Sequence, residues 1–177
     1  MIDPKTGIAG QRLYGVTGWK NAGKTGLVER LVADITGRGY SVSTIKHAHH
    51  NVDIDEKGRD TYRHREAGAR EVVLASANRW ALMHELRGVS EPALAEIVTK
   101  LAPVDLVIVE GYKRESHPKI EAYRHAGGGA RGLLAHELPT IRAIASDTPL
   151  DDIALPVFDL DDTAAISDFV LAECGLA

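Results

Sequence analysis

Hydrophobic and polar positions follow two periods in turn along the chain, and their order predicts an α/β protein. From Gly23 onward, apolar residues recur one, three and four positions apart until two glycines follow, which is the pattern of an amphipathic helix. The segments on either side of it, Arg12–Thr17 and the β-branched Tyr40–Lys46, predict strands. The run VDLVIVEG, at Val104–Gly111, is apolar almost throughout, as a central parallel strand buried on both faces should be.

The remaining segments continue this alternation. Asp60 is expected to cap a short helix that ends near Gly68, and two strands around a turn near Ala77–Asn78 are expected to follow as a hairpin. Ser90 opens a second amphipathic pattern, which predicts a helix with apolar residues as far as Leu101. Three further strands, a flexible glycine loop and a closing helix are expected at KIEAY, TIRAIASD, PVFDL, AGGGARG and Asp161–Cys174. This order predicts a doubly wound, mostly parallel sheet with a β-hairpin excursion.

Length and composition narrow the class of protein. The chain has 177 residues, 44% hydrophobic and 26% charged, which predicts a single globular domain at residues 12–177 behind a flexible tail at residues 1–11. The formal net charge of −4 gives no electrostatic reason to expect nucleic acid or an anionic membrane as a partner. The single cysteine, Cys174, can form neither an internal disulfide nor a cysteine-based zinc site. Because there is also no long apolar run, we expect a cytoplasmic protein without a membrane span.

The segment GWKNAGKT, from Gly18 to Thr25, matches the phosphate-binding loop pattern G-x-x-x-x-G-K-[ST] in full. Its glycines allow a tight loop whose N–H groups face phosphate oxygens, Lys24 reaches the β- and γ-phosphates, and the Thr25 hydroxyl ligates Mg²⁺. The loop follows a predicted strand and opens a predicted helix, whose positive dipole end lies beneath the phosphates. The sequence therefore predicts a P-loop NTPase-type fold. The residues expected to bind the nucleotide are Gly18, Trp19, Lys20, Asn21, Ala22, Gly23, Lys24, Thr25 and Gly26.

A second acidic group is expected beside this loop. Glu110 ends the apolar strand, where the ends of parallel strands face the ligand, whereas Asp105 begins it and is interpreted as structural. We expect Lys24 and Glu110 to be the catalytic pair and Glu110 to help hold Mg²⁺, the alternative being that Glu110 only caps a turn.

Recognition of the base is less specific in the sequence. The guanine signatures N-K-x-D and T-K-x-D are absent, but Asp147 in IASD follows a late predicted strand, where its carboxylate can accept from guanine. The alternative is an ordinary turn residue, since aspartate is common in turns.

The polar segment at Thr44–Asp60, TIKHAHHNVDIDEKGRD, admits three interpretations. His47, His49 and His50 favour a transition-metal site only weakly, because zinc requires three or four convergent ligands. A solvated loop is the second interpretation. The third is a mobile loop that completes the nucleotide site, with Asp53 joining Thr25 and Glu110 as a magnesium ligand.

The segment IKHAHHNVDIDEKGRDTYRHREAGA, together with NRWALM, VDLVIVEGYKRESHPKIEAYR and AIASDTPL, resembles the MobB family, the adapter proteins of molybdopterin-guanine dinucleotide biosynthesis. The resemblance spans roughly Leu13 to Val170. It implies a homodimer that binds GTP with Mg²⁺, hydrolyses it slowly and assists the guanylyltransferase MobA, which attaches GMP to molybdopterin. It leaves open whether molybdopterin-bearing proteins are further partners. The residues that the resemblance assigns to phosphate, magnesium and guanine are Gly18, Gly23, Lys24, Thr25, Glu110 and Asp147.

The loop departs from the S-G-T-G-K-T-T pattern common in the family. Lys20, Asn21 and Ala22 precede Gly23, and Gly26 follows Thr25. The core motif is intact, so phosphate binding is still expected, with an altered affinity or hydrolysis rate.

Two alternative functions remain. A P-loop small-molecule kinase would need a lid of arginines, for which Arg63, Arg65 and Arg70 are candidates, although their spacing favours a solvated helix face. A metal-delivery GTPase is suggested by the eight histidines of the chain, but relatives of that type combine histidine-rich segments with paired cysteines, which this chain lacks.

Overall fold

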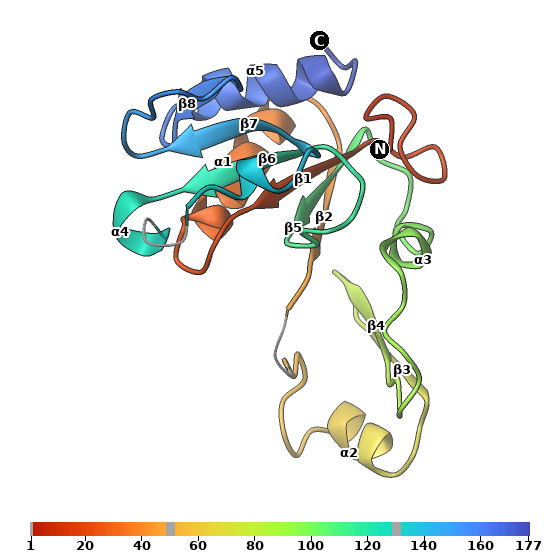
Figure 1. Cartoon of the computed structure of the whole chain (residues 1–177). Coiled ribbons are helices and arrows are strands. Elements are labelled where there is room, and N and C mark those ends of the chain that lie inside the picture. The colour runs from red at the N-terminus through yellow and green to blue at the C-terminus, as the bar shows by residue number, and fades with distance from the viewer. Residues whose placement is uncertain (1, 49–51, 129–131) are drawn as a thin grey trace. The chain divides into compact units, whose positions relative to one another are not determined.

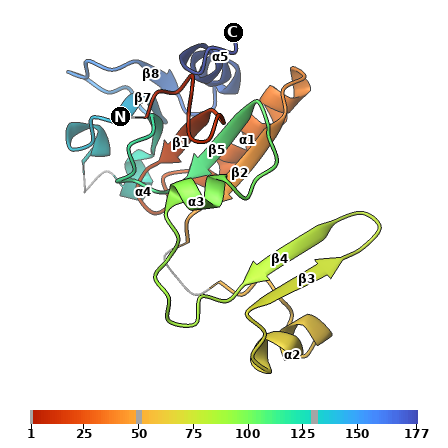
Figure 2. The same ribbon diagram turned by 90° about the vertical axis from the view of Figure 1, so that its right-hand side faces the viewer.

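The computed structural model describes residues 2–48, 52–128 and 132–177, and the chain divides into two compact units. The first, here called the sheet unit, comprises Met1–His47 and Leu94–Ala177, and the second, the hairpin unit, comprises Ala48–Ala93. Both can be followed in Figure 1 and, from a second direction, in Figure 2, and each is described by itself. The expectation of one domain behind a flexible tail stays a prediction.

Within the described residues of the sheet unit, six strands form one sheet in which every neighbouring pair is parallel. In spatial order they are β2 (Val42–Lys46), β5 (Leu106–Glu110), β1 (Leu13–Thr17), β6 (Lys119–Tyr123), β7 (Ile141–Ser146) and β8 (Val157–Asp159). β1 stands inside the sheet, with β5 on one side and β6 on the other, so the chain winds outward from it in both directions. The predicted doubly wound, mostly parallel sheet is confirmed.

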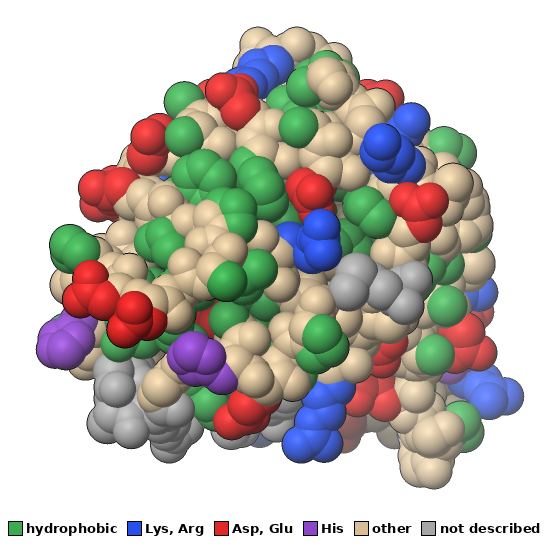
Figure 3. All heavy atoms as spheres, turned by 45° about the horizontal axis from the view of Figure 1, so that its top comes forward, with side chains coloured by type: hydrophobic (Ala, Val, Ile, Leu, Met, Phe, Trp, Pro, Cys, Tyr) green, Lys and Arg blue, Asp and Glu red, His purple; other side chains and the backbone are tan. Residues whose placement is uncertain are grey.

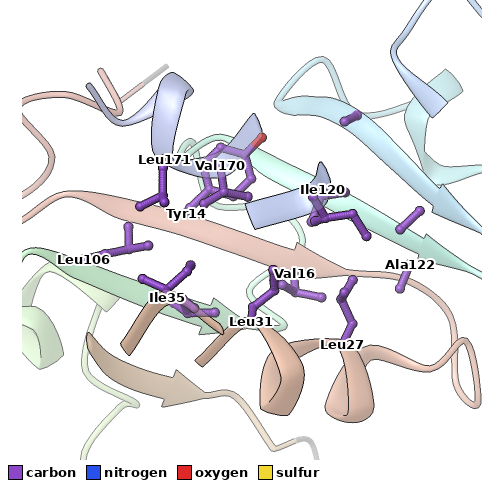
Figure 4. Close-up of a cluster of buried hydrophobic side chains, with 14 of the residues drawn as sticks. Tyr14, Val16, Leu27, Leu31, Ile35, Leu106, Ile120, Ala122, Val170 and Leu171 are labelled. Atoms are coloured by element: carbon purple, nitrogen blue, oxygen red, sulfur yellow. The ribbon is translucent and has the colours of Figure 1, made fainter. Parts of the chain in front are cut away.

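Successive strand residues point to opposite sides of the sheet, so a strand that is apolar throughout has two faces to bury. Helices cover both faces of this sheet. Tyr14 and Val16 of β1 belong to a core shared with α1 (Lys24–Gly37) and α5 (Thr163–Glu173), which Figure 4 shows in close-up. Leu13 belongs to a second cluster, on the face covered by α3 (Leu94–Val98). Each face of β1 is thus buried, and the end of the strand is held in place from both sides.

Three local predictions were wrong in detail. α3 begins only at Leu94 and ends at Val98. Pro92 accounts for the non-helical backbone at Glu91, because a proline disfavours helical backbone at the residue before it. α2 (Asp60–Glu66) has Arg59 as its N-cap, and Asp60 is instead its first residue, with its carboxylate 3.7 Å from Arg63.

The third correction concerns the predicted glycine loop. Its first residues lie in α4 (His125–Gly128), a single turn, and a short 3₁₀ helix, η2, follows at Leu134–His136. The turn is supported by Asp147, whose Oδ1 accepts a hydrogen bond of 2.9 Å from the His125 N–H, one of the donors that a helix start leaves unpaired. The middle of the predicted loop, at residues 129–131, lies outside the described residues.

Close packing against β1 buries a histidine. A Cβ on Gly15 would lie 2.7 Å from His117 Nε2 and 2.7 Å from Lys119 Cγ, so only glycine fits there. The His117 side chain is fully buried, and neither ring nitrogen has a hydrogen-bond partner in the part of the chain that the structure describes. Burial, with a smaller contribution from Lys119, lowers the pKa of His117 to about 3.

The hairpin unit consists of α2 and an antiparallel pair, β3 (Glu71–Ala75) and β4 (Trp80–His84), as predicted. Arg65 of α2 holds this unit together. Its Nη1 donates a 2.9 Å hydrogen bond to Asp53 Oδ1, and its Nη2 donates one of 2.9 Å to Asp53 Oδ2. The same guanidinium has its Nε 3.4 Å from Glu85 Oε1. Its side chain is only 12% exposed, so these bonds are strong enough to fix the segment before α2.

Along the described ranges of both units, no helix combines the length and the apolar character that crossing a membrane requires.

Candidate functional site

The ends of the parallel strands gather the predicted site residues at one edge of the sheet. Thr17 is the last residue of β1, Glu110 of β5 and Lys46 of β2, and the register pairs Glu110 with both Val16 and Lys46. The loops that follow these strands therefore emerge side by side, with the predicted phosphate loop in the centre. We refer to Gly18–Thr25, Lys46 and Glu110 together as the strand-end site.

The phosphate loop has the tight backbone that its glycines predict. Gly18 and Gly23 have φ angles of 145° and 90°, and a Cβ on Gly18 would lie 2.3 Å from the Ala122 carbonyl oxygen. Asn21 also has a positive φ, of 65°, in a region that asparagine enters more readily than most residues. Gly23 is the N-cap of α1, so the unpaired N–H groups of a 14-residue helix begin at the loop. This backbone is suited to binding phosphate oxygens.

Lys24 turns back over the loop. Its Nζ donates a 2.7 Å hydrogen bond to the Trp19 carbonyl oxygen, which holds the ammonium among the loop residues. Burial lowers the pKa of Lys24; Glu110 acts in the opposite direction, while Lys113 and Lys46 lower the pKa further. Several ammonium groups therefore converge on the loop, as a bound polyphosphate would require.

Trp19 is fixed by contacts of its own. Its Nε1 donates a 2.9 Å hydrogen bond to the Gly132 carbonyl oxygen, and the Lys113 ammonium lies 4.3 Å from the centre of its ring. That distance is typical of a cation–π contact.

Thr25 and Glu110 form the polar centre of the site. Thr25 Oγ1 donates a 3.1 Å hydrogen bond to Glu110 Oε1, and the same carboxylate oxygen lies 3.3 Å from Lys46 Nζ. The Glu110 side chain is only 10% exposed. A hydroxyl and a carboxylate side by side are the hard oxygen ligands that Mg²⁺ prefers, and they already attract a cation, so they fit a magnesium ion. Thr25 and Glu110 are the residues that would hold it.

Asp147 does not join Thr25 and Glu110 at this centre, and Asp53 is described separately because it lies in the other unit. Asp147 is exposed at the end of β7, on the same edge of the sheet but separated from β1 by β6, and its Oδ1 accepts from the His125 N–H. Asp53 belongs to the hairpin unit, where it pairs with Arg65. Its proposed role as a magnesium ligand stays a prediction.

The histidine segment is described only at its start. The His47 ring stacks on Tyr112, with ring centroids 4.4 Å apart, while His49 and His50 lie outside the described residues. Within residues 2–48, 52–128 and 132–177, no three histidine, cysteine, aspartate or glutamate side chains come together as a metal-binding group.

Three basic residues of this edge were missed in the sequence. Lys46 contacts Thr25 and Glu110, Lys113 contacts Trp19, and Arg124 Nε lies 2.9 Å from the position of a Cβ on Gly23. Lys46 ends β2, Arg124 directly follows β6, and Lys113 stands three residues after β5. The available signal was therefore that each basic residue follows a strand closely. This signal can be used only when the order of the strands in the sheet is known.

Among the described residues, the face drawn in Figure 3 has no large patch of one charge. On the face drawn in Figure 3, acidic and basic side chains are interspersed, with hydrophobic side chains between them. This agrees with the modest net charge of −4.

Comparison with known proteins supplies independent information. The model of the family described as "MobB: Molybdopterin guanine dinucleotide synthesis protein B" matches residues 13–147. The molybdopterin-guanine dinucleotide biosynthesis adapter protein of Escherichia coli (strain K12) is 37% identical over 162 residues, which cover 90% of this chain and 91% of the relative. The adapter protein of the same name from Haemophilus influenzae is 38% identical over 163 residues, or 89% and 86% of the two chains.

Solved structures agree on the fold. The crystal structure of a MobB protein homolog from Bacillus stearothermophilus has a TM-score of 0.69 at 28% identity, covering 93% of this chain and 99% of its own. Bacillus subtilis MobB has a TM-score of 0.70 at 24% identity, covering 91% and 96%. The second likeness, at this lower identity, supports the fold alone.

Proposed function

Because the chain belongs to the MobB family, we propose that it is a GTP-binding adapter of molybdopterin-guanine dinucleotide biosynthesis, with Mg²⁺ as the accompanying ion. The observation that carries the proposal is a complete phosphate loop whose Thr25 hydroxyl is bonded to the strand-end acid Glu110. The adapter role rests on the names of the two relatives with 37% and 38% identity. The partner we propose is a MobA-type guanylyltransferase, on the family resemblance.

Weak intrinsic GTP hydrolysis is part of this proposal. The carboxylate nearest the loop, Glu110, accepts from Thr25 and pairs with Lys46, so it is oriented toward a metal position rather than toward an attacking water. Lys24 and the loop N–H groups neutralise the phosphates. Such a site binds a nucleotide firmly and turns it over slowly.

Guanine selectivity provides the test of the proposal. In calorimetric titrations with Mg²⁺, we expect GTP and GDP to bind more tightly than ATP. Asp147→Asn should weaken GTP binding by roughly 10- to 100-fold, since a carboxylate that accepts two guanine hydrogen bonds contributes about 1.5–3 kcal/mol. ATP binding should hardly change.

Asp151→Asn is the matched control, since Asp151 is an exposed aspartate in the following loop. Equal affinities for ATP and GTP in the wild type would reject the GTP-binding adapter, and an unaltered GTP affinity in Asp147→Asn would reject Asp147 as the base reader.

The kinase alternative has less support. Arg65, one of the proposed lid arginines, is already engaged by Asp53 and Glu85 inside the hairpin unit. Recruiting it over a phosphate would break a bidentate ion pair whose arginine side chain is only 12% exposed.

Besides the complex with a MobA-type guanylyltransferase, we propose that the chain forms a homodimer. On one face of the hairpin, the register places Val73 opposite Leu82 and Ala75 opposite Trp80. Val73, Leu82 and Trp80 are 59%, 45% and 70% exposed. On the other face Val72 and Met83 are each 7% exposed, and Leu74 is 55% exposed. An apolar strand face of this kind is typical of a surface that is covered in an assembly.

Trp80→Glu should therefore convert the dimer to a monomer. Tryptophans at the centre of interfaces often contribute about 2 kcal/mol or more, so we expect the dimer dissociation constant to rise at least about thirtyfold. Light scattering coupled to gel filtration should show the mass falling to that of one chain, 19.1 kDa.

Val157→Glu, at an exposed hydrophobic position in β8 of the sheet unit, is the control that should leave the dimer intact. A wild-type protein that already has the mass of one chain at micromolar concentration would contradict the dimer.

A further inference from the structure

Lys46 occupies an unusual position for a strand-end lysine. Its Nζ lies 3.3 Å from Glu110 Oε1 and donates to Thr25 Oγ1 at 3.5 Å, while these two oxygens are 3.1 Å apart. One ammonium group is therefore held by the same two oxygens that fit a magnesium ion.

The hydrogen bonds show that the ammonium contacts Thr25 Oγ1 as an acceptor. Thr25 gives its hydroxyl proton to Glu110, so the oxygen has only lone pairs left for another partner. Lys46 donates to this oxygen. A metal ion held by both Thr25 Oγ1 and Glu110 Oε1 would have to lie within reach of the same two oxygens that the ammonium contacts. An ammonium and a magnesium ion therefore compete for one place.

The two partners differ in their freedom to move. The Glu110 side chain is 10% exposed and belongs to β5, which lies between β1 and β2 inside the sheet. The Lys46 side chain is 59% exposed at the last residue of β2, on a flexible four-carbon stem. When a doubly charged ion arrives with a nucleotide, Lys46 can withdraw toward solvent while the two oxygens stay in place.

We propose that Lys46 holds the magnesium position in the nucleotide-free protein and is displaced when Mg²⁺ and nucleotide bind, so that Lys46 sets the magnesium dependence of nucleotide binding. The inference rests on the proposed function. It adds a positioning residue that keeps Thr25 and Glu110 correctly oriented without metal. Lys46 is also the residue before His47, the last residue of the first segment of the sheet unit.

Direct binding of phosphate is the alternative role for a lysine at this position, and the experiment distinguishes the two. A lysine that binds phosphate directly would strengthen nucleotide binding whether or not a metal is present. A lysine that occupies the metal position opposes the metal, and so its removal should favour metal binding.

The test compares Lys46→Met with the wild type in two measurements. The first is Mn²⁺ binding without nucleotide, followed by electron paramagnetic resonance, with Mn²⁺ standing in for Mg²⁺ at oxygen ligands. The second is GTP affinity over a range of Mg²⁺ concentrations and in EDTA. We expect Mn²⁺ to bind at least about fivefold more tightly to Lys46→Met, and the Mg²⁺ concentration at half-maximal effect to fall about tenfold, because a competing charge has been removed.

Two further variants separate displacement from general electrostatics. Lys46→Arg keeps a cation at the position and should restore weak Mn²⁺ binding. Lys113→Met removes a positive charge that also acts on Lys24 but whose ammonium lies over Trp19, so its effect on Mn²⁺ measures the background of charge alone. The Lys46→Met effect should exceed it.

Unchanged Mn²⁺ affinity and an unchanged Mg²⁺ midpoint in Lys46→Met would overturn the inference. So would a loss of GTP affinity in EDTA with no change in the midpoint, which would assign Lys46 to phosphate. If the wild type bound no GTP while Lys46→Met still tightened Mn²⁺ binding, the proposed function would fail, and the competition between Lys46 and the metal ion would stand without the link to nucleotide.

Discussion

Replacing Lys24 with alanine is expected to weaken GTP binding in the presence of Mg²⁺ by roughly a hundredfold or more. The Lys24 ammonium is partly buried and hydrogen-bonded to the Trp19 carbonyl oxygen, so it is held within the loop that would enclose the phosphates. Two charge-assisted hydrogen bonds to phosphate oxygens contribute about 3 kcal/mol together, which corresponds to the hundredfold change. Isothermal titration of both proteins with GTP measures it directly.

Lys20→Ala provides the comparison within the same loop. Lys20 is exposed, so its charge is screened by solvent and salt, and its removal should reduce the affinity only a few times. Thermal unfolding should be nearly the same in both variants, because neither side chain belongs to the hydrophobic core. If Lys24→Ala bound GTP as tightly as the wild type, the phosphate-loop assignment would be wrong.

Acid should destabilise the protein through His117. Its pKa is about 3 in the folded chain but near 6.5 when the side chain is exposed by unfolding. Between these two values the unfolded state binds one more proton, so stability rises with pH and is lost as the pH falls below about 6.5. The loss from this one group approaches roughly 4 kcal/mol at pH 3, a large part of the stability of a small domain.

His117→Leu should remove this acid sensitivity. The variant no longer buries two ring nitrogens without partners in the described structure, so at pH 7 it should be at least as stable as the wild type. His117→Gln keeps a polar side chain that does not titrate, and it separates the effect of the proton from that of polarity. Urea unfolding at several pH values between 4 and 7 gives the slope of the free energy of unfolding against pH for each protein. Parallel slopes for the wild type and both variants would refute the assignment.

Much of the sheet unit follows from its sequence because the apolar runs are unambiguous. Leu106–Glu110 is buried at every position, and for Leu106–Val109 that is what the uninterrupted apolar sequence indicated. The contact between Thr25 and Glu110 was also predictable, since the ends of neighbouring parallel strands meet at one edge.

The rest of the site depends on information that a linear pattern lacks. Lys46 was overlooked because the histidines after it attracted the metal interpretation, while its contact with Glu110 requires β2 and β5 to be neighbours. Residues 47–105 separate these two strands along the chain, so no local signal pairs them. The start of α4 was missed for a similar reason, since its His125 N–H is satisfied by Asp147, more than twenty residues away.

The two tryptophans of the chain fall in different units, Trp19 in the phosphate loop and Trp80 on the exposed face of β4. Trp19 is in contact with Lys113 and Gly132, so we expect a phosphate that binds in the loop to change the surroundings of its indole ring and hence its fluorescence. The emission of Trp80 instead responds to whatever covers the hairpin and excludes water from it. A chain that keeps only one of the two indoles would therefore carry a built-in optical probe, of the proposed nucleotide binding in one case and of the proposed dimer in the other.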